Sequence, residues 1–191
     1  MKKLRYFYGT MASAKSSNLL MKVHQFEQSG SKCLLLKPSV DTRVKNKIYS
    51  RIVPSRSCEI IDWTDNVCEI VLKINKPYDC IFVDEVQFLK EEHIKQLWTL
   101  AHKHNMDVYC YGLKLDYKNE LFPASKQLLI LADTVEEIKS KCSYCPKKAT
   151  THLRYVNEKA VKNGESVHID KIDVNNEKYV SVCQDCWDKA R

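Results

Sequence analysis

The segment Gly9-Thr10-Met11-Ala12-Ser13-Ala14-Lys15-Ser16 has the residue types and spacing of a loop that binds nucleotide phosphates. In such a loop the backbone N–H groups turn toward the phosphates, a lysine neutralises the β and γ charges, and a hydroxyl group coordinates Mg²⁺. Gly9, Lys15 and Ser16 fill these fixed positions, between an apolar run and a stretch with helical spacing. The segment therefore predicts a site for ATP and Mg²⁺.

Ala14 departs from this pattern, because it stands where the motif has a glycine. A Cβ atom is tolerated there only if the local φ is negative or nearly so. Taken alone, the segment could also be an ordinary strand, turn and helix with a surface lysine. The interpretation therefore depends on the other motifs.

Two adjacent carboxylates, Asp84 and Glu85, follow the apolar run at 80–83. Ligands of open α/β sheets bind at the carboxyl edge of the strands. An aspartate there can hold the Mg²⁺ shell, while a neighbouring carboxylate could accept the proton of a substrate hydroxyl during attack on a γ-phosphate. The alternative is a helix-capping acid followed by a solvated glutamate. The preceding phosphate loop favours the functional interpretation.

Four cysteines form two C-x-x-C pairs, Cys142 with Cys145 and Cys183 with Cys186. Four thiolates complete a tetrahedral zinc site and leave no open position for catalysis, so the predicted role of Zn²⁺ is structural. Such a zinc contributes on the order of 10 kcal/mol to folding. A redox pair or core cysteines are the alternatives. The remaining cysteines are interpreted as buried thiols without assigned chemistry: Cys33, Cys58, Cys68, Cys80 and Cys110.

Composition bounds the class of protein. The chain has 191 residues and a formal net charge of +7, which suits one folded domain with a small appendage and an anionic ligand. The lysines are scattered, so nucleic-acid binding is the weaker interpretation. The N-terminal apolar run is too short for a signal peptide or a membrane span. Nine cysteines fit a reducing compartment, and we expect a cytoplasmic protein that does not bind membranes.

Alternating apolar runs and amphipathic segments predict a parallel α/β sheet flanked by helices, of the type found in P-loop NTPases. At Cys142 the pattern changes to short, polar, cysteine-bearing segments. We expect a P-loop nucleotide-binding domain over 1–141 and a zinc-ribbon domain over 142–191. Strands are expected at 4–8, 33–37, 78–84, 107–113 and 135–139, and helices around 19–26, 90–104 and 123–131.

A phosphate loop containing Met11, a strand end that reads D-E-x-Q-F and two C-x-x-C pairs, in this order, resemble the thymidine kinase family of the cellular, zinc-containing type. Asp41-Thr42-Arg43, Tyr111-Gly112-Leu113 and Leu131-Ala132-Asp133 agree, so the resemblance spans nearly the whole chain. It implies transfer of the ATP γ-phosphate to the 5′-hydroxyl of thymidine or deoxyuridine, giving dTMP in nucleotide salvage. It also implies a homotetramer and a zinc ribbon whose long loop, the lasso, closes over the nucleoside.

The resemblance also implies a role for each site residue. Glu85 corresponds to the general base for the 5′-hydroxyl, and Ile172 lies where lasso backbone groups read the base. ATP and Mg²⁺ are expected at Gly9, Met11, Ala12, Ser13, Ala14, Lys15, Ser16, Ser17, Arg43 and Asp84. The nucleoside is expected at Met11, Gln87, Phe88, Leu113, Tyr117, Phe122, Ile172 and Tyr179.

The sequence departs from the family pattern at Ala14, which leaves an inactive relative conceivable, and in the lasso, where 173–179 lacks the usual glycine pair and the lasso path is open. Two further hypotheses are therefore weighed. One is a zinc-ribbon P-loop ATPase that binds nucleic acid, which predicts a Lys/Arg stripe with aromatic residues on the ribbon. Acidic residues between 158 and 177 make that stripe poor. The other is a catalytically inactive relative, against which the intact lysine, serine and carboxylates of the two motifs argue.

Overall fold

The computed structural model describes residues 2–74, 77–164 and 177–190, and its larger part is a parallel six-stranded sheet. The strands pair in the order β5-β2-β6-β7-β1-β8, with every pairing parallel. Their bounds are β1 (Leu4–Gly9), β2 (Cys33–Pro38), β5 (Glu59–Ile61), β6 (Cys80–Val83), β7 (Asp107–Gly112) and β8 (Thr134–Ile138). The predicted α/β fold class is confirmed.

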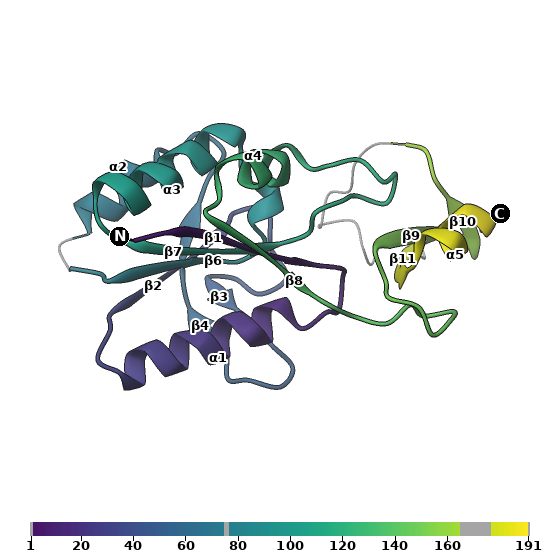
Figure 1. The fold of residues 1–191 in the computed structure, drawn as a ribbon, viewed down its shortest axis with the longest axis horizontal. Helices are drawn as coiled ribbons and strands as arrows, with labels where there is room; N and C mark the ends of the chain where they lie inside the picture. Colours follow the sequence, from purple (N-terminus) through teal and green to yellow (C-terminus); the bar gives the residue numbers. More distant parts are fainter. Residues whose placement is uncertain (1, 75–76, 165–176, 191) are drawn as a thin grey trace.

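Helices cover both faces of this sheet (Figure 1). The helix α1 (Lys15–Gln28) lies on one face, and α2 (Val67–Lys73), α3 (Glu91–Lys103) and α4 (Pro123–Leu131) lie on the other. The short 3₁₀ helix η1 (Val86–Phe88) follows β6 directly. A three-layer arrangement of this kind buries both faces of the sheet, as its uniformly apolar central strands require.

Each face has its own hydrophobic core. Leu19 and Val23 of α1, spaced one helical turn apart, pack under Phe82 and Tyr109, whose rings stack with centroids 4.6 Å apart. Ile94 and Leu97 of α3 belong to the core of the opposite face. These helical spacings are the ones from which the helices were predicted, so packing and local pattern agree.

A smaller antiparallel sheet follows the main one and carries the cysteine pairs at its ends. It consists of β9 (Thr151–Val156), β10 (Lys159–Val161) and β11 (Glu177–Val182), in the order β10-β9-β11, and α5 (Gln184–Lys189) closes it. It lies to the right of the main sheet in Figure 1, beyond the carboxyl ends of the parallel strands. A domain boundary at residue 141 stays a prediction.

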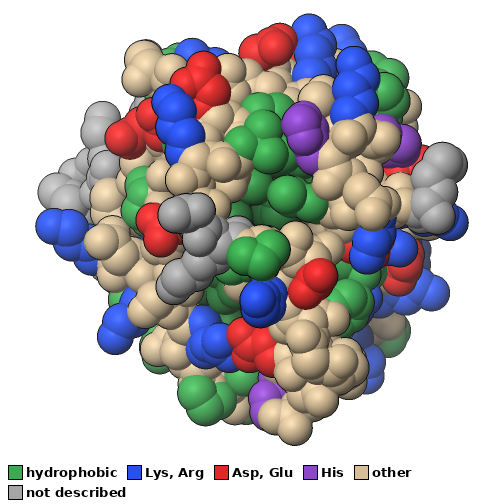
Figure 2. All heavy atoms as spheres, turned by 90° about the vertical axis from the view of Figure 1, so that its left-hand side faces the viewer, with side chains coloured by type: hydrophobic (Ala, Val, Ile, Leu, Met, Phe, Trp, Pro, Cys, Tyr) green, Lys and Arg blue, Asp and Glu red, His purple; other side chains and the backbone are tan. Residues whose placement is uncertain are grey.

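Several short elements were missed by the sequence analysis. In and around the main sheet they are β5, α2, η1 and the two-stranded sheet of β3 (Lys47–Ile48) and β4 (Arg56–Ser57), and in the smaller part they are β9, β10, β11 and α5. Within the described ranges, no helix is both long enough and apolar enough to cross a membrane. On the face opposite the small sheet, Lys and Arg side chains lie interspersed with Asp and Glu (Figure 2).

Candidate active site

A cavity of about 560 Å³ opens at the carboxyl ends of the parallel strands. The phosphate loop after β1 and the acidic turn after β6 form its floor, and the segment after β7 adds apolar side chains. Two residues of the small sheet, His152 and Tyr179, complete the wall. Of the sequence-predicted site residues, the cavity is lined by Met11, Ala12, Ser13, Ala14, Lys15, Ser16, Ser17, Arg43, Glu85, Gln87, Phe88, Leu113, Tyr117, Phe122 and Tyr179.

Three predicted residues are not among those that line the cavity. Gly9 ends β1 beneath the loop, and a Cβ on it would lie 2.4 Å from Ser13 Oγ and 2.6 Å from the Ile138 carbonyl oxygen. This close approach explains the glycine. Asp84 is buried behind Ser16, and Ile172 lies outside the described residues.

Ala14 adopts a φ of +63°, and Ala12 a φ of +58°. The expectation of a negative φ at Ala14 was therefore wrong. The left-handed conformation costs an alanine about 1–2 kcal/mol. Ala14 directly precedes α1, and its carbonyl accepts the Asn18 N–H at 2.9 Å. The chain thus makes the glycine-type turn of a phosphate loop with alanine in it.

Lys15 is buried at the start of α1, and its Nζ donates to the Thr10 carbonyl oxygen at 2.7 Å. Burial lowers the pKa of this ammonium group, while the carboxylates of Glu85 and Asp84 oppose that shift. The lysine is therefore a desolvated basic group inside the loop. A desolvated cation in this place attracts phosphate oxygens strongly.

Ser16, which lines the cavity, is bonded to the buried Asp84 behind it. Ser16 Oγ donates to Asp84 Oδ2 at 2.8 Å, while Asp84 Oδ1 is buried and has no hydrogen-bond partner within the described ranges. Burial and, next, the charge of Glu85 raise the pKa of Asp84 to about 7. A hydroxyl and a carboxylate with an unpartnered oxygen are the hard donors that Mg²⁺ prefers, so the site fits this ion.

Glu85 stands in the cavity with both carboxylate oxygens engaged. Its Oε1 accepts from Arg43 Nη2 at 2.5 Å and its Oε2 from Gln87 Nε2 at 2.6 Å. Gln87 Oε1 in turn accepts the Leu113 N–H at 3.0 Å. Arg43 is also held by Asp41, at 2.7 Å between Nε and Oδ1. The predicted base is therefore fixed by groups from three separate segments.

Aromatic and apolar side chains surround the space beside Glu85. Phe88 and Phe122 pack edge to face with centroids 5.9 Å apart, and Tyr117 packs against Tyr179 at 6.5 Å. Apolar walls with a few fixed polar groups are typical of small-molecule pockets. The predicted nucleoside residues that the structure describes are thus brought together.

Two residues of the small sheet were missed by the sequence analysis. Met11 donates its backbone N–H to His152 Nε2 at 2.8 Å, and its carbonyl accepts from Ser181 Oγ at 2.8 Å. Burial, and then the charge of Lys15, lowers the pKa of His152 to about 4. The imidazole is therefore neutral at neutral pH and can accept this bond. A single histidine in a strand pattern gives no local signal of such a contact.

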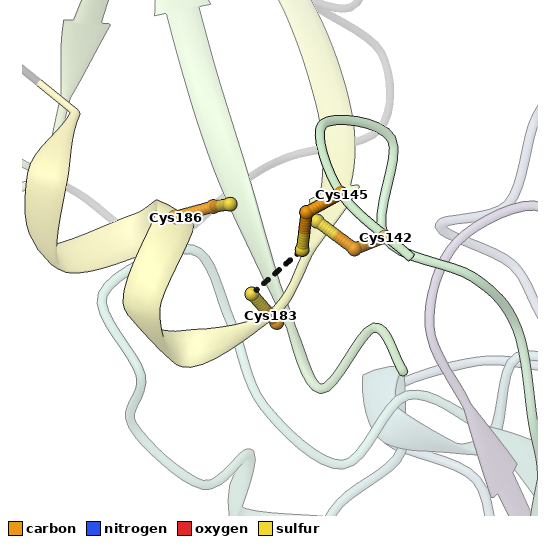
Figure 3. A group of neighbouring side chains, drawn as sticks. All are labelled: Cys142, Cys145, Cys183 and Cys186. Atoms are coloured by element: carbon orange, nitrogen blue, oxygen red, sulfur yellow. Dashed lines mark hydrogen bonds between the residues drawn. The ribbon is translucent and has the colours of Figure 1, made fainter. Parts of the chain in front are cut away.

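The four cysteines of the C-x-x-C pairs converge on one point (Figure 3). Their Sγ atoms all lie within 4.8 Å of one another, and those of Cys145 and Cys183 are 3.5 Å apart. Four thiols at these separations fit the tetrahedral coordination of zinc, whose Zn–S bonds are about 2.3 Å long. Leu153 and Val182 form the small core beside them. The cluster is thus consistent with a zinc ribbon.

Comparison with known proteins gives one result throughout. A family model described as thymidine kinase matches residues 2–187. A thymidine kinase of Streptococcus gordonii is 41% identical over 186 residues, which cover 96% of this chain and 95% of that protein. A thymidine kinase of Lactococcus lactis subsp. lactis is 39% identical over 185 residues, 96% of each chain. One of Streptococcus pyogenes serotype M3 is 38% identical over 186 residues, again 96% of each.

Proposed function

The chain belongs to the thymidine kinase family, and from this premise we propose which residues of the cavity carry each part of the reaction. The protein is an ATP-dependent kinase that phosphorylates thymidine in nucleotide salvage. A nucleic-acid-binding ATPase is not favoured. The proposals concern the residue roles, the metal ions, the acceptance of deoxyuridine, and the assembly.

ATP binds with its β- and γ-phosphates in the loop from Gly9 to Ser17. The buried Lys15 and the backbone N–H groups of the loop that have no partner in the described ranges meet these phosphates. The N–H groups of Met11 and Ser13 are bonded to His152 Nε2 and to the Thr10 carbonyl oxygen. Arg43 lines the same cavity and contacts the transferring group. Ser16 and Asp84 hold Mg²⁺. When bound, the ion neutralises charge on the phosphates. The unpartnered Oδ1 of Asp84 supports this role, because a buried carboxylate oxygen without a partner is costly unless a ligand occupies it.

Glu85 accepts the proton of the thymidine 5′-hydroxyl as that oxygen attacks the γ-phosphate. The hydrogen bonds from Arg43 and Gln87 hold its carboxylate in place, so its orientation is preorganised. The Arg43 guanidinium joins Glu85 to Asp41 and lines the cavity, where it stabilises the charge that develops on the transferring group.

The nucleoside lies against Met11, Phe88 and Leu113, between the two aromatic pairs described above. The lasso, including Ile172, is outside the described residues, and its role in reading the base stays a prediction. Deoxyuridine differs from thymidine only by the absence of one methyl group. A hydrophobic pocket discriminates one such group weakly, so we propose that both are substrates.

Zinc bound by the four cysteines holds the ribbon that supplies His152 and Tyr179 to the cavity. We also propose the homotetramer. Its support is a set of exposed apolar side chains on α4 and β8, where Leu129, Ile130 and Val135 are 39%, 65% and 41% exposed. A cytoplasmic location is proposed because zinc-bound thiolates persist in a reducing compartment.

The placement of Glu85 between the phosphate loop and the apolar walls carries this proposal. Purified protein with ATP, Mg²⁺ and thymidine should form thymidine monophosphate, with deoxycytidine and single-stranded DNA as parallel arms. Glu85→Gln should lower turnover roughly 10²–10⁴-fold while nucleoside binding persists. Glu91→Gln, on the exposed surface of α3, is the matched control. Full turnover by Glu85→Gln would remove the base role; DNA-stimulated ATP hydrolysis without nucleoside phosphorylation would refute the kinase reaction.

A further inference from the structure

Two cysteines outside the zinc cluster meet at the amino ends of β2 and β6. Cys33 and Cys80 are directly paired in the parallel register of these strands, and their Sγ atoms are 3.3 Å apart. Neighbouring strands lie about 4.8 Å apart, within the Cα separation of about 4.4–6.8 Å that a disulfide bond spans. The backbone therefore already has the spacing that an S–S bond requires.

The two thiols differ in exposure and acidity. Cys33 is half-buried and Cys80 is only 1% exposed, so a reagent in solution meets Cys33 first. The hydrogen bond with Cys80 lowers the pKa of Cys33, and the charge of Arg56 lowers it further. Burial and the charges of Glu27 and Asp79 act in the opposite direction but do not cancel the shift. The same bond, followed by burial, raises the pKa of Cys80. Cys33 is thus the nucleophile and Cys80 its buried partner.

The other thiols outside the zinc cluster lack this arrangement. Burial raises the pKa of Cys58 to about 11 and also raises the pKa values of Cys68 and Cys110. Thiols of that kind are mostly protonated and react slowly. The interpretation of Cys33 and Cys80 as inert core thiols, made from their sequence positions, does not account for their mutual contact.

We propose that Cys33 and Cys80 form a dithiol site that low-molecular-weight disulfides, such as oxidised glutathione, convert into an intrachain disulfide bond. The Cys33 thiolate attacks one sulfur of glutathione disulfide, which forms a mixed disulfide and releases the first glutathione thiolate. Cys80 then attacks Cys33 Sγ, gives up its proton, and displaces the second glutathione as the thiol. Two protein thiols are oxidised and one glutathione disulfide is reduced to two glutathione molecules.

The bond would join strands whose opposite ends support the cavity. β2 leads to Asp41 and Arg43, and β6 leads to Asp84 and Glu85. The cross-link closes the chain between residues 33 and 80, and closure of a long segment restricts the unfolded state. The oxidised protein should therefore unfold at a higher urea concentration than the reduced protein.

The test treats the zinc-loaded full chain with oxidised glutathione, blocks free thiols with iodoacetamide, and maps tryptic peptides by mass spectrometry. The peptides that carry Cys33 and Cys80 should appear cross-linked, lighter than their sum by two hydrogen atoms, with two glutathione molecules released per bond. Dithiothreitol should reverse the reaction. Cys80→Ser should stop at glutathionylated Cys33, and Cys33→Ser should leave Cys80 unmodified.

Cys68→Ser is the matched control and should cross-link like the wild-type protein. Wild-type protein that keeps glutathione on Cys33 without forming the cross-link would overturn the proposal. So would wild-type protein in which neither cysteine reacts while the folded state, followed by circular dichroism, persists. Both readouts use the unmutated chain, so they remain decisive if a serine variant does not fold.

Discussion

Asp84→Asn should change how the stability of the free protein depends on pH. The buried carboxyl has a pKa of about 7 in the folded state, against about 3.9 for an unperturbed aspartate. Between these values the folded chain holds a proton that the unfolded chain has lost. The free energy of unfolding therefore falls as pH rises above about 4, and it levels off once the pH exceeds the folded pKa near 7.

The size of the effect follows from the two pKa values. Between about pH 5.5 and pH 8.5 the single titration of Asp84 predicts a loss of about 2 kcal/mol in the free energy of unfolding. Asparagine keeps an acceptor for Ser16 Oγ and carries no charge at any pH. The asparagine NH₂ group would stand where Oδ1 now lies without a hydrogen-bond partner in the described ranges. An unsatisfied amide lowers the free energy of unfolding by about 1–3 kcal/mol, and it does so equally at both pH values.

Urea unfolding of both zinc-loaded proteins at the two pH values measures this difference. The stability of Asp84→Asn relative to the wild type should rise by about 2 kcal/mol from the lower pH to the higher. Comparing slopes with pH cancels the constant cost of the amide and the titration of every group that does not interact with Asp84; Glu85 and Lys15 do interact with it. Asp62→Asn, at an exposed position, should keep the wild-type slope. Parallel pH profiles for the wild type and Asp84→Asn would refute the assignment of a buried, protonated Asp84.

Three other substitutions test single features of the site. Ala14→Gly should relieve about 1–2 kcal/mol of left-handed strain in the folded state, while the greater entropy of the unfolded chain should cost about 0.4–1 kcal/mol of stability. Urea unfolding should therefore show a net gain in stability. Ala124→Gly, inside α4, is the control and should show a loss. Gly112→Ala places a Cβ 2.4 Å from Gln87 Oε1. Displacement of Gln87, which holds Glu85, should lower kcat roughly 10–100-fold. Unchanged steady-state kinetics would contradict the positioning role of Gln87. Cys145→Ser should lose its zinc and the order of the ribbon, and metal analysis that finds wild-type zinc content would contradict the four-thiolate site.

The sequence predicted the central strands and long helices because their signals are local. The apolar runs of β2 and β6 and the helical spacing of Leu19, Val23 and Phe26 in α1 are visible in a window of a few residues. β5 has only three residues and α2 has seven. Segments this short do not show a recognisable period of apolar residues. The predicted strand at 78–84 begins instead at Cys80.

Candidate site residues could be selected from the sequence where they belong to a motif, and their roles stay proposals. Lys15, Ser16 and the two carboxylates follow from spacing, whereas the contacts of Met11 with His152 and Ser181 join residues 141 and 170 positions apart. A separation of that size leaves no trace in a local pattern. The φ of Ala14 was predicted wrongly for a related reason. The motif indicates that a glycine is usual at this position, but it does not indicate which backbone conformation an alanine adopts there.

These long-range contacts alter what the zinc ribbon is expected to do. Met11 belongs to the phosphate loop, yet both its N–H and its carbonyl are bonded to side chains of β9 and β11. β9 begins at Thr151, and β11 ends at Val182, next to Cys183 of the cysteine cluster. The order that zinc would give the ribbon is therefore shared with the loop that we propose for ATP, as well as with Tyr179, which we propose for the nucleoside. Because Met11 loses both partners if the ribbon unfolds, removal of zinc should weaken the binding of ATP and of thymidine together.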